Sequence, residues 1–485
     1  MTATPTTPTP RARAMAVTPT TSTPGTAATA LPSTVVEGPP TVRLGVLGCG
    51  TVGSSLVRLI ADNGDAIAAR SGIRLDVTRI AVADVTKRRP LDLAPGVLGG
   101  DAEAVVRDPG IDVVVELMGG VDPTHDLILT ALESGKPVVT ANKELVASVG
   151  PDLFEVAAKR GVDLLYEAAV AGAIPLLRPL RESLAGDRLQ RVMGIVNGTT
   201  NFILTAMAAH GRSYEDALAE AQALGYAERD PTADVEGLDA AAKAAILATV
   251  AFGARVVASD VYREGITAVT ARDIALAARL GYVVKLLAVA EAFDGAAAAG
   301  GGGGPAAAGP GEVEVAVRVH PAMVPVGHPL ASVRDAFNAV FVEGSAVGEL
   351  MFYGRGAGGL PTASAVLGDV IDAALNLRRG TSSPAAGGVL APARIRPMDE
   401  LRSQYYLTMD VLDRPGVLEQ VAGAMARHGV SILKMEQLGL GAEARLVLVT
   451  HTASERAVQA TLAELGRLEV VDRTGTLLRV VGHEE

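Results

Sequence analysis

A lysine and an aspartate one helical turn apart are the residues with the clearest capacity for chemistry. From about residue 238 the sequence has a helical, Ala-rich pattern, which places Asp239 and Lys243 on one face. An ordinary ion pair at this spacing contributes only about a few tenths of a kcal/mol. It leaves unexplained the acids just upstream, Glu228, Asp230 and Asp234. Carboxylates gathered near a lysine can bind an ammonium group and tune the proton affinity of the lysine.

A second lysine follows a short apolar run. The segment Thr140–Glu144 comes directly after a predicted strand at 137–140, at the sheet edge where parallel sheets keep their ligands. Most lysines are simply solvated on the surface, but this position favours a functional role for Lys143. Repulsion between the two ammonium groups would lower the proton affinity of Lys243.

These lysines suit proton transfer in hydride chemistry. When hydride reaches an aldehyde carbon, the oxygen becomes an alkoxide and takes a proton from a nearby acid. One Cys and seven scattered His form no zinc signature. Lysine is therefore the best available proton donor.

A glycine-rich turn offers a place for a nucleotide. It separates a predicted strand at 42–47 from a predicted helix at 54–69. The glycines permit a tight turn and close approach to a pyrophosphate, and the helix N-terminus supplies free N–H groups. The motif alone is weak, but here a strand precedes it and a helix follows. We predict dinucleotide binding by Gly48, Gly50, Thr51, Val52 and Gly53.

The segment after the second predicted strand carries opposing signals. A carboxylate there, such as Asp84, binds the ribose 2′-hydroxyl of NAD, whereas a basic cluster accepts the 2′-phosphate of NADP. The cluster Lys87-Arg88-Arg89 is present as well, although it can be an ordinary solvated turn. We favour NADP, with Lys87 as a contact, and keep NAD as the alternative.

Strands and helices alternate in the first part of the chain. Predicted strands at 42–47, 75–82, 113–117 and 137–140 are separated by predicted helices that include 54–69 and 123–134. This alternation indicates βαβ units and a parallel sheet of the Rossmann type. The last part reads strand, helix, strand, strand, helix, strand, which is the ferredoxin-like order. Its elements are predicted at 404–412, 417–428, 431–438, 444–450, 454–465 and 468–480.

Low-complexity stretches divide the chain. Residues 1–40 are mostly Thr, Pro and Ala, and we expect a disordered extension. An Ala/Gly-rich insert at 295–311 lies between a helical pattern ending near Glu291 and a predicted strand at 313–319. A Gly, Pro and Ser-rich linker is predicted at 381–399. The folded parts are then 41–160, 161–380 and 400–482.

Composition excludes some classes of function. The net charge of −11 and the absence of Trp argue against a nucleic-acid partner. No apolar run is long enough for a membrane span. The single cysteine, Cys49, forms no intrachain disulfide, which fits a cytoplasmic location.

Several motifs of the chain resemble those of homoserine dehydrogenases. Ala221–Lys243 is similar to the signature of that family at every fixed position. Further similar motifs are Thr140–Glu144, Glu167–Pro175, Asn197–Asn201 and Gly354–Thr362. The resemblance covers about 41–482 and implies a Rossmann-type dinucleotide-binding domain, an α+β catalytic and dimerisation domain, and a C-terminal ACT domain. It implies NAD(P)H-dependent reduction of L-aspartate 4-semialdehyde to L-homoserine, a step toward threonine, methionine and isoleucine.

The resemblance also implies roles for single residues. Lys243 matches the proton donor, and Lys143 a second lysine at the reacting centre. The matching substrate-binding residues are Glu228, Asp234, Asp239, Gly198 and Thr199. Gly225, Lys143 and Gly358 fall where the family contacts the dinucleotide. In place of the Arg that some NADP-binding members carry after the second strand, this chain has Ala83, followed by Asp84.

A monovalent-cation site, usually for sodium, is implied as well. Its ligands would be the Glu167 carboxylate and the backbone carbonyls of Val170, Gly172 and Ile174, which are hard oxygen ligands. Without the resemblance, Glu167 would be read as a surface residue at the end of a helix or strand.

The C-terminal part resembles ACT domains, which bind amino acids at paired interfaces. Residues 413–418 fall at its first strand–helix turn, where that family has a ligand loop, so threonine is the expected effector. A module that only dimerises is the alternative. The family implies a homodimer or homotetramer. Two other functions stay open: a non-catalytic amino-acid sensor on a dehydrogenase scaffold, and a dehydrogenase for a related amino-acid aldehyde.

Overall fold

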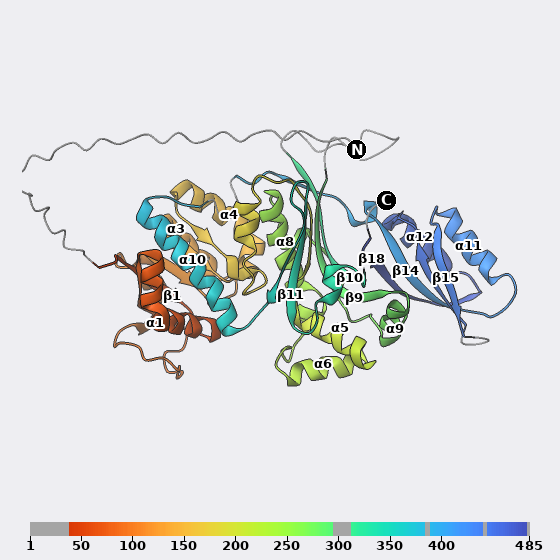
Figure 1. Cartoon of the computed structure of the whole chain (residues 1–485), viewed down its shortest axis with the longest axis horizontal. Helices are drawn as coiled ribbons and strands as arrows, with labels where there is room; N and C mark the ends of the chain where they lie inside the picture. The colour runs from red at the N-terminus through yellow and green to blue at the C-terminus, as the bar shows by residue number, and fades with distance from the viewer. Residues whose placement is uncertain (1–37, 294–311, 384–388, 440–443, 483–485) are drawn as a thin grey trace, which may run out of the picture. The chain divides into compact units, whose positions relative to one another are not determined.

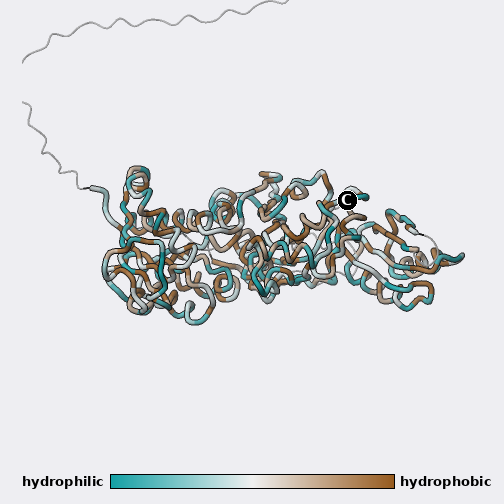
Figure 2. The backbone as a smooth tube through the Cα atoms, turned by 90° about the horizontal axis from the view of Figure 1, so that it is seen from below, coloured by the Kyte–Doolittle hydropathy of each residue, from teal (hydrophilic) through white to brown (hydrophobic). Residues whose placement is uncertain are grey.

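The computed structural model describes residues 38–293, 312–383, 389–439 and 444–482. The predictions for residues 1–37 and for the Ala/Gly-rich insert lie outside the described residues. Hydrophobic and hydrophilic stretches alternate along the described chain (Figure 2). Within these ranges, no helix is long and apolar enough to span a membrane.

The first sheet has six parallel strands in the order β3-β2-β1-β4-β5-β6. This is the Rossmann order, with a reversal between β1 and β4 where ligands bind, and it confirms the predicted fold. The predicted strands all form, within one or two residues of their expected bounds. The strands are β1 (Thr41–Leu47), β2 (Arg74–Ala81), β3 (Leu98–Gly99), β4 (Val113–Glu116), β5 (Val138–Thr140) and β6 (Leu164–Leu165).

Helices cover both faces of this sheet. One of them, α10 (Gly359–Arg379), comes from far along the chain and packs beside α1 (Figure 1). Its residues Val366 and Val370 share a buried core with Leu56 and Ile60 of α1. Helix α10, the last helix of the part expected at 161–380, therefore packs on the first sheet. The other helices are α1 (Thr51–Ser71), α2 (Ala102–Arg107), α3 (Thr124–Glu133) and α4 (Lys143–Arg160).

A second, mostly antiparallel sheet follows. Before the C-terminal module, its strands run in the order β12-β11-β7-β9-β10. Helix α8 (Leu238–Phe252) packs against β9 and β10. The strands are β7 (Leu189–Ile195), β9 (Tyr282–Phe293), β10 (Val313–Pro325), β11 (Phe337–Gly344) and β12 (Gly348–Arg355). The remaining longer helices are α5 (Gly198–His210), α6 (Tyr214–Ala223) and α9 (Ala271–Arg279), and a short α7 (Thr232–Val235) precedes α8.

The predicted helical pattern ending near Glu291 is wrong. Helix α9 ends at Arg279, Gly281 adopts a left-handed φ of 87°, and the chain continues as strand β9. The centre of β9 is buried on both faces. A strand buried on both faces is a continuous apolar run without alternation, and periodicity cannot separate such a run from a buried helix.

The C-terminal module has the strand order β18-β14-β16-β15, which confirms the predicted ferredoxin-like arrangement. Its strand β18 also pairs in parallel with β10, through Ala322–Arg479 and Met323–Val480. Part of the expected linker is ordered as β13 (Ala393–Ile395), which also pairs with β10. The elements are β14 (Arg402–Val411), α11 (Val417–Arg427), β15 (Ile432–Leu438), β16 (Arg445–Thr450), α12 (Glu455–Leu465) and β18 (Val471–Val480).

Candidate active site

The glycine-rich loop joins β1 to α1 and leaves room for a ligand beside Gly50. Gly48 has a left-handed φ of +96°, and a Cβ there would lie 2.6 Å from the carbonyl oxygen of Leu117. A Cβ on Gly53 would lie 2.4 Å from the carbonyl oxygen of Gly48. Packing therefore requires both of these glycines. A Cβ on Gly50 would meet no atom within 4 Å, and this open space fits the close approach of a pyrophosphate.

The first turn of α1 can bind an anion. Gly50, its N-cap, makes no side-chain cap, and the first turn contains no acidic residue. The N–H groups at Thr51 and Val52 are thus at a positive helix end. The segment before α10 adjoins this turn, because a Cβ on Gly359 would lie 2.9 Å from Cγ2 of Thr51. Gly358, with a φ of +126°, precedes it directly.

The basic turn after β2 is held against the glycine-rich loop. Asp84 uses Oδ1 to accept hydrogen bonds from the Thr86 hydroxyl at 2.6 Å and from the backbone N–H groups of Thr86 and Lys87. The Thr86 hydroxyl is the main reason that the pKa of Asp84 is lowered. Arg89 donates from Nε to the carbonyl oxygen of Cys49 at 3.2 Å, and from Nη2 to that of Asp84 at 3.0 Å. Lys87 is exposed on this turn.

Lys143 begins α4 at the carboxyl edge of the first sheet. Its neighbour Asn142 caps the helix by accepting from the N–H of Leu145, and donates from Nδ2 to the carbonyl oxygen of Gly120 at 2.5 Å. Gly120 lies in the loop after β4, which also contacts Gly48. Lys143 is thus linked to the glycine-rich loop through the β4 loop.

Lys243 meets Lys143 at one carboxylate. Nζ of Lys243 donates to Oδ2 of Asp239 at 2.8 Å and to the carbonyl oxygen of Val196 at 2.7 Å. Nζ of Lys143 lies 3.2 Å from Oδ1 of Asp239. The predicted pair within α8 is confirmed, and the structure joins it to the lysine of the first sheet.

Asp239 controls the charge of this cluster. Burial, the largest influence on its pKa, favours the neutral acid, but Lys243 and Lys143 together outweigh burial and lower the pKa to about 2. For Lys143, burial likewise acts to lower the pKa, and the charge of Asp239 reverses this, so that the pKa is raised. The repulsion between the lysines expected from the sequence is therefore offset by the carboxylate that they share.

The acids upstream have different surroundings. Asp234 accepts a hydrogen bond at 2.6 Å from Nδ2 of Asn197, which also donates to Asp239 at 2.9 Å. Asp230 accepts from the N–H and hydroxyl of Thr232, which makes it a turn residue before α7. Glu228 is exposed in the turn after α6. Asp234 and Asp239 are thus brought together, whereas Glu228 lies on the surface.

The predicted glycines and Thr199 shape the loops around this cluster. Thr199 donates from its hydroxyl to the carbonyl oxygen of Tyr226 at 2.7 Å, and so fastens α5 to the 225–228 turn. Gly225 in that turn has a left-handed φ of 77°. A Cβ on Gly198 would lie 2.8 Å from the carbonyl oxygen of Ala336, so this position is closely packed.

Two residues of the cluster were not predicted. Asn197 belongs to the motif Asn197–Asn201, but its contacts were not expected. They join the start of α5 to Asp234 on α7 and Asp239 on α8. Asn338, on β11, donates from Nδ2 at 3.0 Å to the same Val196 carbonyl that accepts from Lys243. No sequence pattern points to Asn338, because it comes from an otherwise apolar strand.

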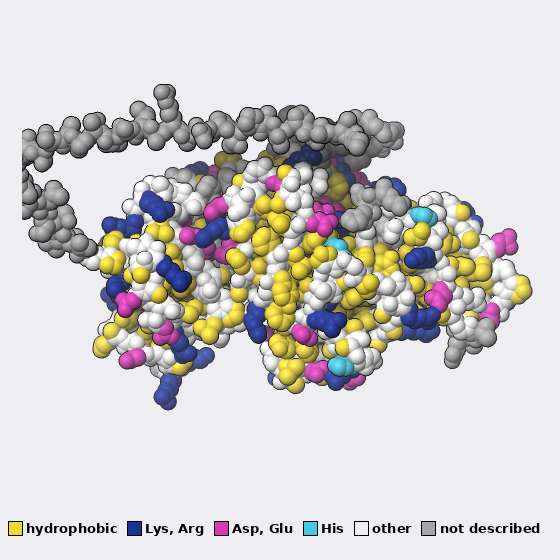
Figure 3. Space-filling view, in the orientation of Figure 1, with side chains coloured by type: hydrophobic (Ala, Val, Ile, Leu, Met, Phe, Trp, Pro, Cys, Tyr) yellow, Lys and Arg dark blue, Asp and Glu magenta, His cyan; other side chains and the backbone are white. Residues whose placement is uncertain are grey.

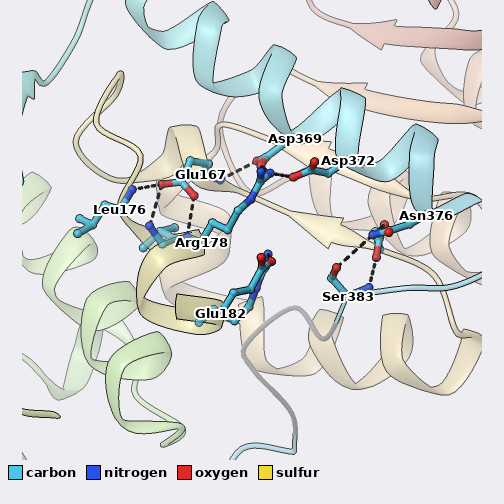
Figure 4. A network of polar contacts seen from close by, with 11 residues as sticks. Glu167, Leu176, Arg178, Glu182, Asp369, Asp372, Asn376 and Ser383 are labelled. Atoms are coloured by element: carbon cyan, nitrogen blue, oxygen red, sulfur yellow. Dashed lines mark hydrogen bonds and ion pairs between the residues drawn. The ribbon is translucent and has the colours of Figure 1, made fainter. Parts of the chain in front are cut away.

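Glu167 is buried and does not lie on the surface. Its carboxylate accepts hydrogen bonds from the backbone N–H groups of Leu176, of Leu177 at 2.7 Å and of Arg178 at 2.8 Å (Figure 4). Its own N–H donates to Asp369 on α10 at 2.8 Å. The carboxylate expected to bind a cation is therefore engaged by three amides.

The segment between these contacts contains the three carbonyls of the expected cation site. Ala171 and Gly172 have left-handed φ values of 55° and 53°, and a Cβ on Gly172 would lie 2.3 Å from the carbonyl oxygen of Gly356. This tight loop also carries Val170 and Ile174. Among the described residues, no group of three or more His, Cys, Asp or Glu could hold a metal ion. A cation here would depend on backbone carbonyl oxygens.

Family models match most of the chain. The model for the homoserine dehydrogenase NAD binding domain matches residues 48–167, that for homoserine dehydrogenase matches 175–371, and that for the ACT domain matches 405–470. Homoserine dehydrogenase of Corynebacterium glutamicum is 48% identical over 439 residues, which are 90% of this chain and 95% of that protein.

Solved structures agree with these matches. A homoserine dehydrogenase from Thiobacillus denitrificans has a TM-score of 0.82 and 39% identity, over 91% of this chain and 98% of that chain. A hyperthermophilic archaeal homoserine dehydrogenase in complex with NADPH has a TM-score of 0.54 and 26% identity, over 69% of this chain and 98% of that chain. The glycine-rich loop, the lysine cluster and these likenesses all lead to one conclusion: the chain belongs to the homoserine dehydrogenase family of oxidoreductases.

Proposed function

We propose that this protein interconverts L-aspartate 4-semialdehyde and L-homoserine with a nicotinamide dinucleotide, on the route to threonine, methionine and isoleucine. The observation that supports this most directly is the pairing of Lys143 and Lys243 with Asp239. Asn142, next to Lys143, donates to Gly120 in the loop after β4, and Leu117 of that loop lies against Gly48. The bound dinucleotide supplies or accepts the hydride. Lys243 gives a proton to the carbonyl oxygen during reduction and takes it back during oxidation.

The acids of the cluster suit the amino group of the substrate. Asp234 and Asp239 both accept a hydrogen bond from the Asn197 amide, so their carboxylates lie close together. Such a pair can bind an ammonium group by charge and hydrogen bonds. Glu228 is exposed in the turn between α6 and α7. We propose that it contacts the same amino group as Asp234 and Asp239 when substrate binds. Gly198 and Thr199 hold the neighbouring backbone, and Gly225 and Gly358 line the dinucleotide.

We propose NADP as the preferred cofactor. The free N–H groups of α1 fit the pyrophosphate, and the basic turn carrying Lys87 and Arg89 is anchored beside it. Oδ1 of Asp84, by contrast, is engaged by its own turn. A family member solved with NADPH supports the same choice. A second proposal is a sodium ion held by the carbonyl oxygens of Val170, Gly172 and Ile174.

We further propose that residues 400–482 form a regulatory module that binds threonine. A small cavity at its first strand–helix turn is lined by residues 411–418 together with Gln437 and Leu446. Gly416, the N-cap of α11, has a left-handed φ of 90°, and a Cβ there would meet no atom within 4 Å. A homodimer or homotetramer is expected as well. Hydrophobic side chains gather around β11 (Figure 3), where Met351 and Tyr353 of β12 are exposed.

A steady-state assay tests the function directly. Aspartate semialdehyde is supplied with NADPH or NADH, each with and without threonine, and homoserine formation is measured. Turnover with NADPH that threonine reduces is the expected result. Binding of threonine without turnover would instead indicate an amino-acid sensor, and faster turnover with another amino-acid aldehyde would indicate a related dehydrogenase. Sedimentation at several protein concentrations gives the oligomeric state.

A further inference from the structure

We propose that Asn197 is a positioning residue, whose side-chain amide holds Asp234 and Asp239 together so that Asp239 can bridge the two lysines. The inference deepens the proposed function and rests on it, because it concerns the same cluster. Asn197 lies between β7 and α5 and is 4% exposed.

The orientation of this amide is determined by helix α5. Oδ1 of Asn197 accepts from the backbone N–H of Thr200 at 2.8 Å and from the Thr200 hydroxyl at 2.9 Å. A backbone N–H can only donate, so the oxygen must face the helix. The two hydrogens on Nδ2 are left to face Asp234 and Asp239, at 2.6 and 2.9 Å. Every donor and acceptor of the side chain is then used.

This arrangement offsets a repulsion. Two carboxylates at one site disfavour each other's ionised form, and the Asn197 amide gives each of them one N–H. Oδ2 of Asp239 accepts from both Asn197 and Lys243, and Oδ1 faces Lys143. Without the amide, the Asp239 carboxylate is free to rotate and to pair with one lysine at the expense of the other.

Asn197→Asp separates this role from helix capping. Aspartate caps helices as well as asparagine does, so the bond to Thr200 is kept, while the donor becomes a third carboxylate. We expect kcat/KM for homoserine oxidation to fall by about 100-fold, the loss that small misplacements in a site produce. The added negative charge favours the protonated form of a neighbouring base, so the rising limb of the pH–rate profile moves to higher pH. The Kd for NADPH is unchanged.

Asn197→Ser and Ser213→Ala complete the test. Serine also caps α5 but cannot donate to both carboxylates, so kcat/KM falls without the upward shift of the profile. Ser213 caps α6 through the N–H of Asp216, and its replacement lowers stability while leaving the profile unchanged. Wild-type kcat/KM and pH profile in both Asn197 variants would show that Asn197 only caps α5.

Failure of the proposed function would look different. The wild-type protein would then not oxidise homoserine. The role of Asn197 would be tested by titration of the lysine side chain instead of by enzyme activity. In 13C-lysine-labelled protein, the Nζ titration of Lys143, whose pKa is raised by Asp239, moves to higher pH in Asn197→Asp if the amide positions Asp239. An unmoved titration in a folded variant overturns the inference, whatever the substrate.

Discussion

Lys143 and Lys243 lie far apart in the sequence but contact the two oxygens of a single carboxylate, that of Asp239, at 3.2 and 2.8 Å. One lysine begins a helix of the dinucleotide-binding sheet, and the other lies within a helix of the second sheet. The contact therefore joins a helix of the first sheet to a helix of the second.

Asp239→Asn should lower the pKa of Lys143, since burial then acts without the charge of Asp239. The limb of the homoserine oxidation profile that depends on a neutral lysine moves to lower pH, opposite to the shift expected for Asn197→Asp. We expect kcat/KM to fall by about 100-fold or more, because substrate binding is weakened too. Profiles measured between pH 6 and pH 11 check this, and an unmoved limb would contradict the shared-carboxylate account.

Lys243→Ala should abolish turnover while the dinucleotide still binds. General acid catalysis contributes about 100- to 10,000-fold. Lys243 donates to Val196 and Asp239, which lie outside the glycine-rich loop. Stopped-flow rates and the Kd of NADPH, from its fluorescence, provide the check. Near-wild-type turnover would remove Lys243 from the role of proton donor.

Two glycines of the cofactor loop should respond differently to alanine. Gly53→Ala places a Cβ 2.4 Å from the Gly48 carbonyl oxygen and should lower both thermal stability and cofactor affinity. Gly50→Ala meets only open space, so the melting temperature is kept while the Kd of NADPH rises at least about tenfold, the equivalent of about 1.4 kcal/mol. Equal effects on melting temperature would mean that Gly50 is structural.

Lys285 should make stability depend on pH. It is buried on β9, where its Nζ donates to Oδ1 of Asn201 at 2.8 Å, and burial lowers its pKa from 10.5 to about 8. Because its pKa is lower in the folded than in the unfolded protein, its contribution is complete above about pH 10.5 and is lost as the pH falls through 8. The pKa difference corresponds to about 3 kcal/mol.

Lys285→Met is the matching test. The urea midpoint of this variant should depend less on pH between 8 and 10.5 than that of the wild-type protein. Identical slopes for the two proteins would show that the amine stays charged in the native state.

Local patterns predicted most of the fold and part of the site. The alternation of apolar runs and helices gave the parallel sheet, and the spacing of Asp239 and Lys243 gave their pairing. Strand β9 was mistaken for a helix because its burial on both faces removes the alternation.

Contacts between residues far apart in the chain could not be predicted from the sequence. The Lys143–Asp239 pair depends on how the two sheets approach each other. The contacts of the Asn197 amide depend on how α7 and α8 pack beside the start of α5. The resemblance implies Glu167 as a cation ligand, but it does not reveal that the same carboxylate accepts hydrogen bonds from backbone N–H groups.

The pairing of β18 with β10 determines how the C-terminal module can be altered. The N–H of Val481 donates to the carbonyl oxygen of Met323 at 2.9 Å, and Tyr406 and Leu478 belong to the same buried cluster as helix α8. Deleting the module would expose a bare strand edge and apolar side chains, which promotes aggregation. Substitutions within residues 413–418 are therefore a better test of the proposed threonine binding than a shortened chain.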